Sequence, residues 1–333
     1  MTESGDSLSI YREENIMSVT IKYVEIDVTD ACNMACKHCY KSKKKKNEYL
    51  SPDLIIDFLN MLGEKQEISN IVISGGEPLL YPEIAYLLRY LNGKYNIRLN
   101  SNGVLIHEHI DLFRSLEKFK LQISLDGYDR KSYFEMRQLD VFQRVLSNAM
   151  LCKNNGINVD FRTTLGRDNI NDYHKFIEIS NSCGIPIKFK PVVGLDNVES
   201  ECVSIPELKI WYKELEKKNL EKYAEGNLFN AKYSCPLIKD NPVISALYID
   251  EVGDIHPCLG LLGHQFKVGN IYDINYSKLE KNIYDKRDFI RELLELPLCK
   301  SCSTRKNIGD GTCVAACYYG ERECINKVIG EIR

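Results

Sequence analysis

Short runs rich in β-branched residues alternate with longer amphipathic segments between residue 20 and about residue 224. Each short run ends in Gly or Asp, which is typical of strands that lead into turns. These strand-like runs cover residues 24–30, 69–76, 96–103, 120–127, 158–166 and 185–194. The longer segments have helical spacing and helix-type ends, such as Ser51-Pro52 at one start and Gly93 at one end. They cover residues 51–64, 81–93, 141–156, 171–184 and 205–226.

This alternation predicts an α/β fold in which a parallel sheet is covered by helices. Six β-α units can form an open sheet or part of a (β/α) barrel, and in such barrels ligands bind at the carboxyl ends of the strands. Cysteines follow the first strand, GGEP (75–78) follows the second, NSNG (100–103) the third, and SLDG (124–127) ends the fourth. The sequence therefore predicts one functional edge of the sheet.

Composition narrows the class of protein. The chain has 333 residues, of which 44% are hydrophobic and 27% charged, as in ordinary soluble domains. A net charge of −3 gives no support for nucleic-acid binding, and no apolar run approaches the length of a membrane span. The polar N-terminus, residues 1–19, is expected to be a flexible extension and lacks the features of an export signal. Thirteen cysteines without such a signal favour metal binding in a cytoplasmic protein.

The stretch TDACNMACKHCY (29–40) holds three cysteines, Cys32, Cys36 and Cys39. A structural zinc site needs four ligands, and His38 would strain to reach the same tetrahedron as the adjacent Cys39. Thiolates also hold iron–sulfur clusters, and three thiolates on a four-iron cluster leave one iron open. The spacing alone leaves both metals possible.

The spacing C-x3-C-x2-C with GGEP after the next strand resembles the radical S-adenosylmethionine (SAM) superfamily, over residues 20–195. The resemblance implies a partial (β/α)6 TIM-like barrel and a [4Fe-4S] cluster on Cys32, Cys36 and Cys39. It implies that SAM binds the fourth iron and that a low-potential donor such as flavodoxin or ferredoxin reduces the cluster. It also makes His38 a bystander.

The same resemblance suggests SAM contacts. Gly75 and Gly76 would let the backbone approach the methionine of SAM, and Glu77 would accept from its ammonium group. Ser124 matches a family position that contacts SAM, and Asn102 would contact the ribose. Arg137 and Arg162 would bind the carboxylate of SAM, and Tyr40 would lie beside the adenine. Alternatively, Ser124 and Asn102 are turn residues at strand ends, Arg137 and Arg162 form surface or structural ion pairs, and Tyr40 is a packing residue.

Seven further cysteines lie between residues 235 and 324. Read alone they fit a zinc ribbon, but beside a radical SAM barrel they are similar to the SPASM extension with two auxiliary [4Fe-4S] clusters. By that resemblance the outer cluster takes Cys299, Cys302, Cys313 and Cys324, and the inner cluster takes Cys235, Cys258 and Cys317. The sequence departs from the family pattern in two ways. Ten residues separate Cys302 and Cys313, where the family usually has five, and there is no obvious eighth cysteine for the inner cluster.

We therefore expect three segments: the extension 1–19, a radical SAM barrel 20–226, and a smaller cysteine-rich α+β SPASM domain 227–333 that contains a β-hairpin over 246–258. Cys202, expected on the active-site edge, is a speculative hydrogen donor. Cys235 is an alternative donor, because some related peptide epimerases use a cysteine near that position. Cys152 and Cys183 are expected in the core.

The predicted function is cleavage of SAM to a 5′-deoxyadenosyl radical that abstracts a substrate hydrogen. The favoured substrate is a ribosomally made peptide, modified by crosslinking, thioether formation or epimerisation. The alternative is oxidation or epimerisation of a small molecule such as a sugar or aminocyclitol. A sulfatase maturase is disfavoured because Leu259 stands where that branch has Asp. An iron–sulfur electron carrier would leave Gly75–Glu77 unexplained.

Overall fold

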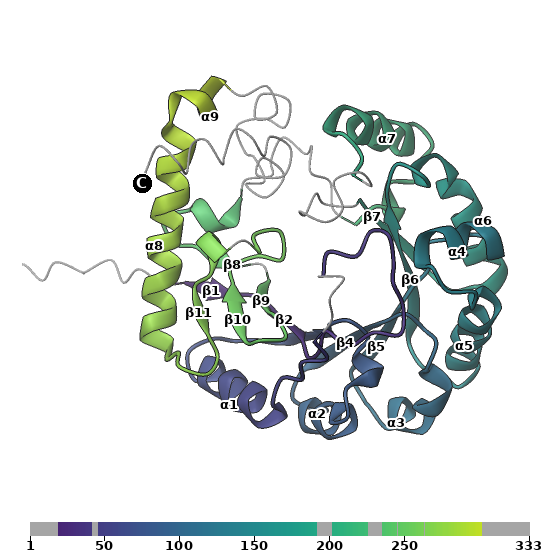
Figure 1. Ribbon diagram of the computed structural model, residues 1–333, viewed down its shortest axis with the longest axis horizontal. Coiled ribbons are helices and arrows are strands. Elements are labelled where there is room, and N and C mark those ends of the chain that lie inside the picture. The colour runs from purple at the N-terminus through teal and green to yellow at the C-terminus, as the bar shows by residue number, and fades with distance from the viewer. Residues whose placement is uncertain are drawn as a thin grey trace, which may run out of the picture.

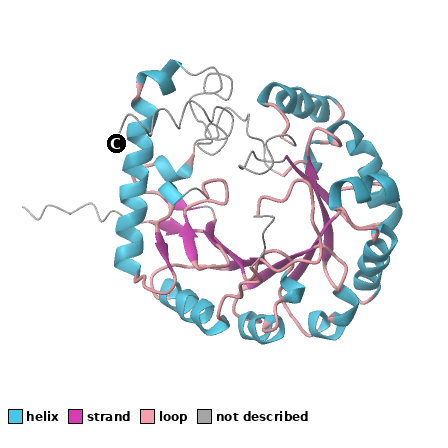
Figure 2. Cartoon of the chain, in the orientation of Figure 1, coloured by secondary structure: helices cyan, strands magenta, loops and turns pink. Residues whose placement is uncertain are grey.

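The structure is a computed structural model that describes residues 19–41, 46–191, 202–225, 235–244, 246–262 and 264–301. A curved sheet forms the inner layer, and helices follow its outer side in an open ring (Figure 1). Figure 2 shows the same two layers by type, with strands inside and helices outside. The expected α/β fold with a partial barrel is confirmed.

Nine strands form the main sheet, in the order β11-β10-β9-β2-β3-β4-β5-β6-β7. Strands β2 to β7 are parallel, each to its neighbour. Their bounds are Tyr23–Asp27, Asn70–Ser74, Asn96–Ser101, Phe119–Ser124, Val159–Leu165 and Ile187–Pro191. All six fall within or beside the predicted strand runs, because period-two alternation of apolar residues marks a strand between two environments.

The outer helices also follow the predicted segments. Five match them: α1 (Pro52–Gly63), α2 (Ile84–Leu91), α5 (Phe142–Asn154), α6 (Tyr173–Cys183) and α7 (Ile205–Lys217). The sequence pattern missed four: α3 (Ile110–Arg114), α4 (Arg130–Arg137), α8 (Tyr276–Glu295) and α9 (Pro297–Ser301). The described residues also contain single 3₁₀ turns: Pro78–Leu80, Ile106–Glu108, Ile170–Asp172, Glu221–Tyr223, Pro236–Ile238 and His264–Phe266.

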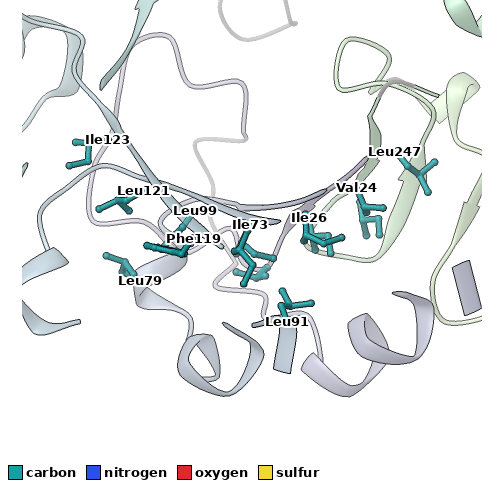
Figure 3. Packing of buried hydrophobic residues seen from close by; sticks show 14 of the residues in the cluster. Val24, Ile26, Ile73, Leu79, Leu91, Leu99, Phe119, Leu121, Ile123 and Leu247 are labelled. Carbon is teal, nitrogen blue, oxygen red and sulfur yellow. The ribbon is translucent and has the colours of Figure 1, made fainter. Parts of the chain in front are cut away.

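The core lies between the sheet and the helices. Alternate residues of the strands, such as Val24, Ile26, Ile73 and Leu99, are fully buried there. Figure 3 shows these side chains on the helix side of the sheet, facing α1 and α2. Because side chains alternate along a strand, the intervening residues lie on the opposite, inner face.

The C-terminal region extends the same sheet. The predicted hairpin is confirmed as β9 (Leu247–Ile249) and β10 (Asp254–His256), which are antiparallel, and β9 pairs in parallel with β2. Strand β11 (Gly269–Asn270) adds to β10, while β1 (Thr20–Ile21) and β8 (Val243–Ile244) form a separate parallel pair. The barrel and the following region thus share backbone hydrogen bonds, and a domain boundary near residue 226 stays a prediction.

Helix α8 packs along this extension through Leu279, Ile283, Ile290 and Leu293. Among the residues that the structure describes, no helix has the length and apolar character needed to cross a membrane.

Candidate active site

The loop that carries the three cysteines, residues 28–41, starts directly after β2 at the carboxyl edge of the parallel strands. Cys32, Cys36 and Cys39 are partly exposed, and none forms a disulfide. Four sets of contacts hold this cysteine loop, one at its start, one in its middle, one beside Cys36 and one at its end.

The start of the loop is held by the glycine pair after β3. The Gly76 N–H donates to the Thr29 carbonyl at 2.7 Å, and the Glu77 N–H donates to the Ala31 carbonyl at 2.8 Å. A Cβ on Gly76 would lie 2.3 Å from the Ala31 oxygen, and one on Gly75 would lie 2.5 Å from the Thr29 oxygen. We expected these glycines to let the backbone approach SAM; in the structure the close approach is to the cysteine loop itself.

Glu77 is turned toward β4 and is fully buried. Its carboxylate accepts from the Ser101 hydroxyl at 2.8 Å, the Asn102 N–H at 2.7 Å and the Leu79 N–H at 3.2 Å. Burial raises the pKa of Glu77 to about 7, although these three donors favour the charged form. The predicted ammonium acceptor is therefore engaged by protein donors and joins the ends of β3 and β4.

Asn102 holds the middle of the loop. Its side-chain amide donates to the Asn33 side-chain oxygen at 2.6 Å, and its own side-chain oxygen accepts from the Val104 N–H at 3.0 Å. The expected ribose contact is thus occupied with fixing the loop. Asn33 is a loop anchor that the sequence analysis missed, and its position between Cys32 and Cys36 is the available signal.

The third anchor is a buried charge network beside Cys36. The Arg137 guanidinium lies 2.5 Å from the Asp126 carboxylate and donates to the Cys36 sulfur at 3.5 Å. The His38 Nε2 atom lies 3.1 Å from the same carboxylate, while its Nδ1 is buried and has no hydrogen-bond partner among the described residues. His38, expected to take no part in ligating the cluster, lies against Asp126 and helps to hold the loop. Arg137, expected at the SAM carboxylate, lies at the sulfur of an expected cluster ligand.

Within this network, the neighbouring charges stabilise the charged forms of Asp126 and Arg137. Burial acts to raise the pKa of Asp126, but Arg137 and His38 outweigh it and hold that pKa well below its usual range. Burial acts to lower the pKa of Arg137, and Asp126 outweighs it in the opposite direction. The Lys37 N–H also donates to the Met136 carbonyl at 3.0 Å, so the loop is joined to the end of α4.

The end of the loop is fixed by Asp27, which is fully buried on β2. One carboxylate oxygen accepts from the Tyr40 hydroxyl at 2.9 Å and the Tyr248 hydroxyl at 2.5 Å, and lies 2.6 Å from the Lys41 ammonium. Lys41 also pairs with Glu251. Burial, and then the Asp27 charge, raise the pKa of Tyr40 well above its usual value. Tyr40 thus ties the loop to Asp27 of β2, which also accepts from Tyr248 of β9, and the place of Tyr40 beside an adenine stays a prediction.

The other two candidates for SAM lie on neighbouring strands. Ser124 ends β5 and is partly buried, and its hydroxyl has no hydrogen bond to any residue in the described ranges. Arg162, its register partner on β6, lies 2.9 Å from the Glu225 carboxylate and donates to the Gln122 side-chain oxygen at 3.0 Å. Arg162 is therefore separate from the network at Cys36.

The remaining cysteines are dispersed. Cys202 precedes α7, Cys235 precedes a 3₁₀ turn and Cys258 follows β10; all three are partly exposed. The Gly260 N–H donates to the Cys258 sulfur at 3.3 Å. Cys299 is buried on α9 beside Leu293. The other predicted auxiliary ligands, Cys302, Cys313, Cys317 and Cys324, lie outside the described residues.

The donor set of the cysteine loop fits an iron–sulfur cluster better than a single ion. Within the described part of the chain, no three His, Cys, Asp or Glu side chains converge to hold one metal ion. A four-iron cluster takes one thiolate per iron, so its ligands need not converge on one point. Three thiols outside disulfides on one anchored loop, with the Arg137 cation at one sulfur, match that requirement.

Residues 26–179 match the model of the Radical SAM superfamily. This part of the chain is a radical SAM domain. The resemblance in the cysteine and glycine motifs is thereby confirmed for residues 26–179, and a domain of this family implies a [4Fe-4S] cluster and SAM. The C-terminal SPASM assignment stays a prediction.

Curated relatives cover part of the chain. GTP 3′,8-cyclase of Chlorobaculum tepidum is 28% identical over 188 residues, which are 54% of this chain and 56% of that protein. AdoMet-dependent heme synthase of Nitratidesulfovibrio vulgaris is 27% identical over 171 residues, 50% of this chain and 46% of that protein. The chain thus spans about half the length of these relatives.

Solved structures share the fold over more of the chain. Streptococcus suis SuiB bound to S-adenosylmethionine has a TM-score of 0.67 at 16% identity, covering 86% of this chain and 72% of SuiB. Native anSMEcpe with bound AdoMet and Kp18Cys peptide has a TM-score of 0.62 at 16% identity, covering 93% and 99%. At these identities the likeness shows the fold of the radical SAM domain and of part of the following region.

Proposed function

We propose that this protein is a radical SAM enzyme that modifies a peptide. Cys32, Cys36 and Cys39 would hold the [4Fe-4S] cluster, and SAM would complete the coordination of its fourth iron. When bound and reduced, the pair supplies a 5′-deoxyadenosyl radical that abstracts a hydrogen atom from the substrate. The observation that carries the proposal is the cysteine loop, held by four sets of contacts at the carboxyl edge of a radical SAM domain.

The chain's own residues would keep the three thiolates in place. Arg137 supplies a buried positive charge at the Cys36 sulfur, and Asp126 holds Arg137 and His38 in position. Asn102 and Asp27 fix the middle and end of the loop against β4 and β9. A rigid support of this kind keeps reacting groups in a productive geometry.

A peptide substrate is favoured by the shared fold, since SuiB has been solved with the precursor peptide SuiA and anSMEcpe with a bound peptide. The region after residue 227 would then be a SPASM domain in which the cysteines bind two auxiliary clusters. The second candidate is a small-molecule substrate, favoured by the sequence likeness to GTP 3′,8-cyclases. Cys202 and Cys235 remain alternative hydrogen donors in the peptide case.

The test uses the full chain, reconstituted without oxygen with iron and sulfide, then supplied with SAM and a low-potential reductant. Peptides encoded beside the gene and GTP are offered separately, and both are followed by mass spectrometry. We expect a mass change in a peptide and none in GTP. Conversion of GTP with no change in any peptide would contradict the peptide proposal and support the small-molecule candidate.

Iron analysis tests the SPASM part. We expect about twelve iron atoms per chain for one radical SAM cluster and two auxiliary clusters. About four iron atoms, with the SAM cleavage activity intact, would contradict the auxiliary clusters alone.

A further inference from the structure

The end of the cysteine loop is attached to the C-terminal region of the chain. Cys39 is followed directly by Tyr40 and Lys41, and the side chains of both residues reach Asp27. The Tyr40 hydroxyl donates to one oxygen of this buried carboxylate at 2.9 Å, and the buried Lys41 ammonium lies 2.6 Å from the same oxygen. The Tyr248 hydroxyl, from β9, donates to that oxygen at 2.5 Å. One oxygen atom therefore joins the residues after Cys39 to a strand of the C-terminal region.

The register of the sheet places Tyr248 at this point. Strand β9 pairs in parallel with β2, and Tyr248 is the register partner of Glu25. Residues two positions apart on a strand share a face, so Asp27 lies on the same face as Tyr248, one step nearer the carboxyl edge. Tyr248 is 1% exposed, so water does not compete for its hydroxyl. Backbone pairing thus fixes the bond between Tyr248 and Asp27.

The turn of the hairpin supplies a second contact with the loop end. Glu251, between β9 and β10, forms an ion pair with Lys41. The turn has its own hydrogen bonds: the Asp250 side chain accepts from the Asp254 N–H at 2.8 Å, and the Gly253 N–H donates to the Asp250 carbonyl at 2.9 Å. Gly253 has a φ of +81°, in the left-handed region that favours glycine. Glu251 therefore extends from a turn of defined geometry.

Both contacts come from beyond the residues that match the radical SAM model, 26–179. The loss of either contact would leave a buried charged group with fewer partners, and the loop end would lose part of its support. The reduction potential of an iron–sulfur cluster depends on the hydrogen bonds and charges around it and on its exposure to solvent. The placement of Cys39 and the charges beside it therefore affect the potential of a cluster held by this loop.

We infer that Tyr248 and Glu251 are positioning residues for Cys39: the hairpin β9–β10 holds the end of the cysteine loop and thereby helps to set the reduction potential of the [4Fe-4S] cluster. They act through Asp27 and through the two residues that follow Cys39. The inference rests on the proposed function and deepens it, because it makes a part of the C-terminal region a component of the radical SAM site.

Hydrogen exchange tests the support of the loop in the full chain, without reconstitution of any cluster. The Cys39 N–H donates to the Cys36 carbonyl at 3.3 Å, so its exchange reports opening of the loop end. In Tyr248→Phe the ring remains and one hydrogen bond to a buried carboxylate is lost. We expect fragments that cover residues 37–41 to exchange about tenfold faster than in the wild type, as measured by mass spectrometry.

The matched control is Tyr173→Phe, at the start of α6. Tyr173 is also buried, its hydroxyl donates to the Glu214 carboxylate at 2.8 Å, and the Lys218 ammonium donates to that hydroxyl at 2.8 Å. The variant therefore removes the same kind of hydrogen bond from another part of the fold. It is expected to leave exchange in residues 37–41 unchanged.

The effect on the cluster is measured in the reconstituted full chain. A reductive titration followed by electron paramagnetic resonance gives the midpoint potential of the signal that changes when SAM is added, which separates the radical SAM cluster from any auxiliary cluster. Glu251→Gln removes a negative charge that disfavours reduction, so the midpoint should rise. We expect a change of about threefold in the equilibrium constant, which is about 30 mV for one electron. Tyr248→Phe should also shift the midpoint.

The control variants Glu214→Gln and Tyr173→Phe should leave the midpoint at the wild-type value. Three outcomes would overturn the inference: unchanged loop exchange in Tyr248→Phe, equal effects in the control variants, or wild-type midpoints in both hairpin variants. Failure of the proposed function appears separately, as the absence of a SAM-responsive signal from the wild type.

Discussion

On β4, Leu99 is fully buried against the outer helices, whereas Arg98, one position earlier, lies on the inner face and is partly exposed. On β2, Ile26 likewise lies on the helix side, whereas Glu25 and Asp27 lie on the inner face, although both are buried. One face of each strand supplies the apolar core, and the other supplies charged and polar groups, among them groups that hold the cysteine loop. The sheet thus divides stability and chemistry between its two faces.

The largest expected effect is on the free energy of unfolding and concerns the ion pair of Arg137 with Asp126. This pair is an exception to the division because it is charged and yet contributes to stability. Arg137→Leu leaves the buried Asp126 charge without its closest partner and should destabilise the protein by about 3–5 kcal/mol. Urea denaturation measures the change. Adding Asp126→Asn to Arg137→Leu removes the orphaned charge and should recover part of the loss. A double variant as unstable as the single one would show that the pair is not the cause.

The two faces are compared directly by Leu99→Ala and Arg98→Gln. The leucine substitution leaves a cavity in the core and should cost about 2–5 kcal/mol in the free energy of unfolding. Arg98→Gln should change it by less than about 1 kcal/mol, because Arg98 has no direct partner in the described residues. Urea midpoints at constant slope measure both. Equal losses would contradict the conclusion that the outer face carries the stability of the sheet.

Glu77 gives a smaller effect that depends on pH. Its pKa is raised by burial from an ordinary 4.5 to about 7, so between these values the folded state binds more protons than the unfolded state. Its contribution to stability is therefore lost as the pH rises through that window, by at most on the order of 3 kcal/mol. The measurement is the stability of the wild type minus that of Glu77→Gln, from pH 4.5 to 8.

That difference should fall as the pH rises. Glu83→Gln, which removes an exposed carboxylate just before α2, is the matched control. A constant difference for Glu77→Gln would contradict the buried, proton-binding state of Glu77.

Period-two alternation predicted all six parallel strands, and the motifs at their ends predicted the functional edge. The sequence analysis did not predict a charged inner face, although runs such as Ile97-Arg98-Leu99-Asn100 alternate in the required way. Alternation shows that the polar side chains lie opposite the apolar ones. It does not distinguish a side that faces bulk solvent from the inside of a curved sheet. Helix α8 was missed because Arg287 interrupts its apolar stripe and is itself buried. The loop anchors Asn33, Asp27 and Asp126 were missed for another reason: their partners are distant in sequence, and only the fold brings them together.

The most direct measurement of the central claim is release of 5′-deoxyadenosine from SAM by the reconstituted, chemically reduced full chain. The wild type should release it well above the enzyme-free background, and Cys36→Ala should fall to that background because one cluster ligand is lost. Cys183→Ala, at the end of α6, should behave as the wild type. Background release by a wild type that holds its iron, or equal release by Cys36→Ala, would contradict the account.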